Sequence, residues 1–221
     1  MKRARQFLVR ELPLIIGVGL GLTWLWLKGE AFVLDNRVEG YGWGAYLANA
    51  WAMARGAVER YDYFHGPLHG ALVGPLGELL GSYPQAAALV ASIMAVLVVV
   101  GAGLGARALA GPWAGGLAAA AAPMTANAAD MARWANPYPV LAGLTGITLG
   151  LALCTARWPS KRLALLTGCG AALCTVADSR GLLLLPVAAA LVLSGATLRR
   201  RSWVIVPMFC LGLLARPAFL H

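Results

Sequence analysis

Apolar blocks close to 20 residues long recur along this 221-residue chain, and they constrain its fold more than any other feature. A helix needs about 20 apolar residues to cross the ~30 Å hydrocarbon core of a bilayer. The blocks are continuous and rich in Leu, Ala and Gly, whereas the strands of a membrane β-barrel alternate apolar and polar residues. Hydrophobic residues make up 60% of the chain and charged residues only 12%. The chain is therefore predicted to be all-α, a polytopic membrane helical bundle.

Seven blocks are predicted to span the membrane and to form one membrane domain over residues 1–221. The first follows a basic N-terminus but is not followed by a small-residue cleavage site, so we expect an uncleaved helix and not a signal peptide. Residues 28–84 then form the first outer loop, in which 42–58 and 68–80 are predicted as amphipathic helices in the membrane interface. The predicted spans are residues 12–27, 85–110, 113–127, 138–155, 163–177, 182–196 and 203–214.

The placement of charge predicts the orientation. With a cytoplasmic N-terminus, eleven of the 18 basic residues fall on the inner side and eight of the nine acidic residues on the outer side, Glu11 being the exception. This distribution satisfies the positive-inside rule. It also accounts for the net charge of +9 without a nucleic-acid partner. We expect an integral protein of the bacterial inner (plasma) membrane with its first loop outside.

Three polar breaks lie on the predicted outer side. They are the loop at residues 35–67, the segment 130–137 and the segment 178–181. Ionisable groups at membrane depth are costly and usually face a cavity or one another. Taken singly, Asp130 with Arg133 and Asp178 with Arg180 can be plain interfacial ion pairs. Three such breaks on one face instead predict a shared pocket that opens outward.

The order of these segments resembles a known family. The long outer loop opens with acidic residues and ends in Tyr-Asp-Tyr-Phe-His-Gly-Pro-Leu at 61–68, and a Pro…Ala-Arg-x-x-x-Pro break follows at 123–137. In this order the chain is similar to the N-terminal module of the C-type membrane glycosyltransferases. The nearest branch holds the protein O-mannosyltransferases and the aminoarabinose lipid A transferases. The resemblance implies transfer of a sugar from a polyprenyl-phosphate donor to an acceptor on the outer face.

The resemblance also implies roles for individual residues. An acidic residue early in the first outer loop acts as catalytic base or orients the acceptor, and either Asp35 or Glu39 holds that position. The substrate- and phosphate-binding residues implied are His65, Asp130, Arg133 and Arg180. The chemistry is consistent, because a carboxylate can accept the proton of an acceptor hydroxyl and the forked guanidinium of Arg can bind two phosphate oxygens.

A metal site is not assigned. His65 and His69 lie four residues apart and would share a face of a helix. Pro67 between them weakens that reading, and no pair of carboxylates lies nearby at ligand spacing. A divalent cation is left open as a cofactor, and no other cofactor is indicated.

The length of the chain leaves its activity open. Proteins of the resembled family usually continue beyond the seventh span. The chain is therefore expected to be a small transferase, a fragment of a split or truncated gene, or a non-catalytic membrane subunit of a larger envelope complex. The expected partners are a polyprenyl-phosphate lipid, membrane lipids and, in the second case, protein subunits. A secondary transporter is disfavoured, because the two halves do not repeat the same broken helices.

Overall fold

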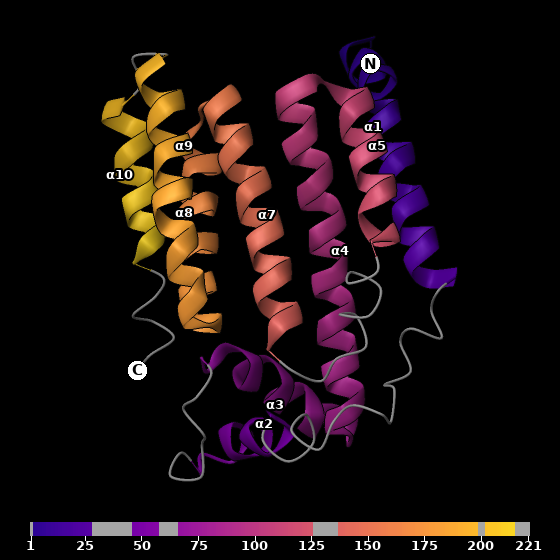
Figure 1. The fold of residues 1–221 in the computed structure, drawn as a ribbon, viewed down its shortest axis with the longest axis vertical. Coiled ribbons are helices and arrows are strands. Elements are labelled where there is room, and N and C mark those ends of the chain that lie inside the picture. Colours follow the sequence, from indigo (N-terminus) through magenta and orange to yellow (C-terminus); the bar gives the residue numbers. More distant parts are fainter. Residues whose placement is uncertain (1, 28–45, 58–65, 126–136, 199–201, 215–221) are drawn as a thin grey trace.

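The computed structural model describes residues 2–27, 46–57, 66–125, 137–198 and 202–214. Every regular element in these ranges is a helix, which confirms the all-α prediction (Figure 1). The elements are α1 (Lys2–Leu27), α2 (Leu47–Ala54), α3 (Leu68–Leu80), α4 (Tyr83–Ala110), α5 (Pro112–Ala121), η4 (Ala122–Met124), α7 (Tyr138–Arg157), α8 (Lys161–Ala177), η5 (Ser179–Leu183), α9 (Leu184–Leu198) and α10 (Ser202–Leu213).

The long helices stand side by side, and α2 and α3 lie across one end of them (Figure 1). In the middle, α4 packs along α7. On one side α5 packs against both α1 and α4. On the other side α8 and α9 pack against α7 and against each other, and α10 packs against α8 and α9. The end that α2 and α3 cover is the one where α4 and α7 begin.

Three helices in the described part of the chain are long and apolar enough to cross a membrane: Gln6–Leu27, Tyr83–Ala110 and Tyr138–Arg157. They fit a protein integrated in a membrane. Many of their large apolar side chains face outward, such as Leu20, which is 58% exposed. Exposure of such an apolar surface to water is unfavourable, whereas contact of the same surface with lipid is not. The remaining helices in the described part of the chain are shorter, so the prediction of seven spans is not confirmed, although a helix lies at each predicted position.

Glycines bring the central helices into contact. A Cβ placed on Gly101 of α4 would overlap the backbone of Gly146 on α7, and one on Gly150 would meet the backbone of Gly101. The same holds between α1 and α5, where Gly17 meets the backbone of Gly116. Helices in lipid associate through small residues that allow this close approach, because burial of apolar surface gives no advantage there.

Several predicted boundaries are wrong. The first span was predicted at 12–27, but the helix that holds it begins at Lys2 and its apolar part at Gln6, so the basic N-terminal turns are helical as well. The third predicted span, 113–127, ends as an α-helix at Ala121, and the short 3₁₀ turn η4 carries Pro123 after it. In the loop, α2 ends at Ala54 and not at residue 58, since Gly56 adopts a positive φ of 67°. The prediction of a helix at 68–80 is confirmed as α3.

A polar clamp holds α2, α3 and α4 together. Arg55 follows α2, and its Nε donates a hydrogen bond of 3.1 Å to Glu78 on α3. The Tyr83 hydroxyl at the start of α4 donates to the same carboxylate, and Arg55 also lies 5.5 Å over the ring of Trp51. The Tyr83 hydroxyl, followed by the guanidinium of Arg55, lowers the pKa of Glu78 below its usual value.

Candidate functional site

One cavity in the described part of the chain has a volume of about 690 Å³. It lies between α4 and α7 and is closed at one side by the end of α1 and by η4. Along α7 its lining runs from Tyr138 to Gly146, a rise of about 12 Å along the helix axis. Most of the lining is apolar. The polar side chains in it are Thr125, Tyr138, Thr145 and Arg180.

The short 3₁₀ helix η5 positions Arg180 at this cavity. Asp178 is the N-cap of η5, and its Oδ1 accepts a 2.8 Å hydrogen bond from the backbone N–H of Arg180. The same oxygen lies 3.8 Å from the Arg180 Nε. The Arg180 guanidinium carbon also lies 5.3 Å from the centre of the Tyr138 ring.

The two charged side chains differ greatly in exposure. The side chain of Asp178 is only 5% exposed, whereas that of Arg180 is 61% exposed. Asp178 therefore serves as a buried anchor for the turn. Arg180 keeps an accessible guanidinium next to an apolar cavity, which suits an anion carried on an apolar molecule.

Residues next to the predicted polar breaks meet at the cavity. Leu25 lies two residues before the end of α1 at Leu27. Thr125 and Tyr138 lie before and after the second break, and Arg180 belongs to the third. These residues are far apart in the sequence and line one space. Most of the first two breaks lies outside the described residues, so their convergence on one pocket stays a prediction.

The end of the first loop reaches the same region. A Cβ built on Gly66 would overlap the carbonyl oxygen of Val176 and lie 2.8 Å from the backbone of Ala177. Gly66 therefore presses against the last turn of α8, directly before Asp178. Only a glycine allows so close an approach of two backbones.

Of the six predicted site residues, Arg180 alone lies in the described part of the chain. Asp35, Glu39, His65, Asp130 and Arg133 lie outside it, so their roles stay predictions. His69 is described: it is 4% exposed and packs edge-on against Tyr46 at 6.2 Å between ring centres. Among the described residues, no three His, Cys, Asp or Glu side chains gather as a metal site would require.

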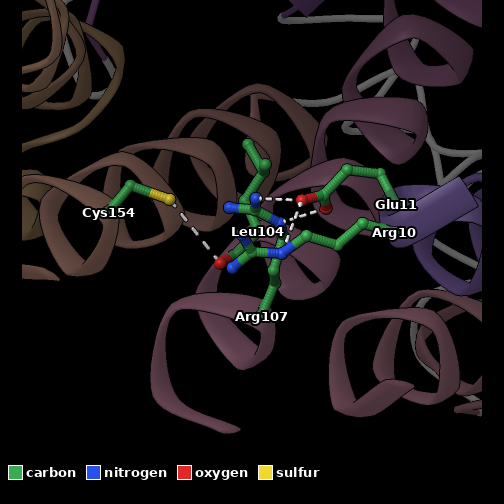
Figure 2. Close-up of polar contacts among 5 residues, drawn as sticks. All are labelled: Arg10, Glu11, Leu104, Arg107 and Cys154. Atoms are coloured by element: carbon green, nitrogen blue, oxygen red, sulfur yellow. Dashed lines mark hydrogen bonds and ion pairs between the residues drawn. The ribbon is translucent and has the colours of Figure 1, made fainter. Parts of the chain in front are cut away.

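Sequence reasoning missed a second polar cluster, at the opposite end of the bundle (Figure 2). Glu11 of α1 accepts two hydrogen bonds of 2.5 Å from Arg107 of α4, one from Nε and one from Nη2. The Arg107 guanidinium carbon also lies 4.5 Å from the centre of the Trp158 ring. The available signal was Glu11 itself, the one acidic residue on a predicted side that otherwise holds only basic ones.

The fold and its cavity define a class of protein: an all-helical chain that fits a membrane, with an apolar cavity lined by one accessible arginine. In comparisons with known proteins, no family model, no curated protein and no solved structure matches this chain. The resemblance to membrane glycosyltransferases rests on the sequence motifs alone.

Proposed function

We propose that this protein binds a polyprenyl-phosphate-linked sugar in the cavity between α4 and α7 and transfers the sugar to an acceptor at the outer face. The observation that carries the proposal is the apolar cavity of about 690 Å³ with Arg180 in its lining. A polyprenyl phosphate combines a long apolar tail with a compact anion. An apolar cavity next to an exposed guanidinium offers a partner for each part.

The proposal includes the position of the chain in the bacterial inner membrane. In it, α1, α4, α5, α7, α8, α9 and α10 all cross the bilayer, with the N-terminus cytoplasmic. The side-by-side arrangement in Figure 1 supports this, as do the three helices of spanning length. The shorter helices would cross where the bilayer thins or where neighbours cover their ends. Tyr138 and Arg180 then lie at the outer end of the cavity, beside α2 and α3.

In the proposed reaction the hydroxyl oxygen of the acceptor attacks the anomeric carbon of the sugar. The bond between that carbon and the phosphate oxygen breaks, and its electron pair leaves with the polyprenyl phosphate. A carboxylate takes the hydroxyl proton, and the resemblance assigns this role to Asp35 or Glu39. Arg180 stabilises the charge on the phosphate, since a cation placed where charge develops lowers the barrier. Asp178 holds the turn that carries Arg180.

Binding is the first test, with the full chain in detergent and a polyprenyl phosphate titrated by native mass spectrometry. Arg180→Gln removes one charge-assisted contact, worth about 1.5–3 kcal/mol, so the affinity should fall at least about tenfold. Ala142→Phe fills the cavity and should weaken binding as well. Arg162→Gln is the control for the loss of one arginine, because Arg162 is exposed and does not line the cavity. Equal affinity of wild type and Arg180→Gln would refute the proposed site.

Transfer is the second test, with polyprenyl-phosphate mannose as the first donor and envelope extracts as acceptor. The double variant Asp35→Asn, Glu39→Gln should bind the donor lipid normally and transfer nothing. Unchanged transfer by this variant would refute the assigned carboxylates. Binding of polyprenyl phosphate by the wild type, without transfer from a panel of donor sugars, would favour the non-catalytic subunit.

A further inference from the structure

We propose a second site, for an anionic glycerophospholipid, at the end of the bundle opposite the α4–α7 cavity mouth. It consists of a cationic pocket for the headgroup and an apolar groove for an acyl chain. The site does not depend on the proposed transferase activity.

The cationic pocket has a volume of about 310 Å³. It lies where α1, the end of α4, the start of α5 and the end of α7 meet. Its charged lining residues are Arg10, Glu11, Arg107 and Arg157. Three arginines and one glutamate give the pocket a net charge of +2. A pocket of this size and charge suits a phosphate and its glycerol.

The charges in the pocket are not equally available. Both oxygens of Glu11 are taken by Arg107 at 2.5 Å, so this pair is internally neutral. Arg10 reaches Glu11 only at 4.0 Å, and its side chain is 72% exposed. Arg157 is exposed at the end of α7. Arg10 and Arg157 therefore supply the positive charge that a headgroup phosphate would meet.

The apolar groove has a volume of about 460 Å³ and runs between α1 and α5. It exists because Gly17 and Gly116 bring the two backbones together and leave no side chain to fill the seam. Trp113 and Leu117, which are 73% and 71% exposed, stand along one wall. The groove faces outward from the bundle, where a lipid chain would lie.

The groove and the pocket adjoin. Arg10 lines both, and Pro112 of the pocket is followed directly by Trp113 of the groove. An apolar groove that ends at a doubly cationic pocket matches a lipid with an anionic headgroup and an acyl chain. Basic pockets between membrane helices bind such headgroups. A free phosphate would use only the pocket, so the groove favours the lipid.

The test uses the full chain in detergent, titrated separately with phosphatidylglycerol, phosphatidylcholine and inorganic phosphate. We expect a clear preference for phosphatidylglycerol over phosphatidylcholine. Each arginine near an anionic lipid contributes about fivefold in affinity, so Arg10→Gln with Arg157→Gln should lower the affinity about 25-fold. Arg162→Gln is the control, since Arg162 is exposed at the same end but lines neither the pocket nor the groove.

Ala120→Phe tests the groove, because Ala120 lines the groove but not the cationic pocket. This variant should weaken phosphatidylglycerol binding and leave any phosphate binding unchanged. Equal binding of the two lipids by the wild type would overturn the proposal. So would an equal loss in Arg162→Gln and in the double variant. Binding of inorganic phosphate as tight as that of phosphatidylglycerol, with no effect of Ala120→Phe, would make the pocket a free-anion site.

Discussion

Breaking the Glu11–Arg107 pair should destabilise the protein unequally, depending on which partner is removed. The perturbations are Glu11→Gln, Arg107→Met and the two together. The side chains of Glu11 and Arg107 are 6% and 19% exposed, and two hydrogen bonds of 2.5 Å join them. They are 96 residues apart in the chain and connect α1 to α4.

The magnitude follows from what each variant leaves behind. Removing one partner of a buried ion pair costs about 3–5 kcal/mol, because the other charge stays buried without compensation. Arg107→Met leaves the more buried group, Glu11, with only Arg10 at 4.0 Å, so its cost should lie at the upper end, about 4–5 kcal/mol. Glu11→Gln keeps an amide oxygen near Arg107, which also retains Trp158, so about 2–3 kcal/mol is expected. The double variant leaves no buried charge and should cost less than Arg107→Met alone.

The measurement is equilibrium unfolding in mixed micelles with increasing denaturing detergent, followed by circular dichroism. Arg162→Gln serves as the control for loss of a positive charge at the same end, and its effect should stay within about 0.5 kcal/mol. The reasoning is refuted if the two single variants cost equal amounts. It is also refuted if the double variant costs the sum of both, since additivity would mean that the two groups do not interact.

Three further outcomes are expected from the described contacts. Asp178→Ala removes the cap of η5 and should lower the free energy of unfolding by about 1 kcal/mol. It should also weaken polyprenyl-phosphate binding, because Arg180 is displaced. Asp178→Asn should retain the cap. The pKa of Glu78 is lowered, so the clamp between α2, α3 and α4 stabilises the fold fully above the usual Glu pKa, and this stability is lost as the pH falls through the lowered pKa. Amide exchange in α3 should therefore rise in acid for the wild type but not for Glu78→Gln. Gly101→Ala should destabilise by about 1–3 kcal/mol because its Cβ has no room, whereas Gly19→Ala, with nothing within 4 Å, should be neutral or stabilising by up to about 1 kcal/mol in the same assay.

Helix positions were predictable because they depend on local sequence: the length of each apolar run and the turn residues at its ends. The helix at 68–80 followed from an apolar run that ends at Gly81, which has a left-handed φ of 66°. The start of α1 at Lys2 was missed because a hydropathy pattern marks where apolar residues begin, not where a helix does. The end of α5 at Ala121 was missed because an Ala-rich run gives no local signal before Pro123.

The site was less predictable, because its parts come from different helices. Arg180 stood out as a charge between apolar blocks, and its place in the third break was read from the sequence. Its contact with Tyr138 was not, since the two residues are 42 positions apart and meet only when α7 and η5 are packed. The Glu11–Arg107 pair was missed for the same reason. The sequence placed both residues on the cytoplasmic side of the membrane, but it did not show that they contact each other.

The cavity itself depends on the small residues, Ala and Gly, on the facing sides of α4 and α7. Ala91 and Ala95 lie four residues apart on α4, and Ala142 and Gly146 lie four apart on α7, so each pair shares one face of its helix. Elsewhere on the same two helices, small residues bring the backbones into contact, as at Gly101 and Gly150. A run of Ala and Gly therefore predicts close packing or an open space equally well. The difference lies in the third wall: at the cavity, Leu25 of α1 and the residues of η4 line the space that the small residues leave.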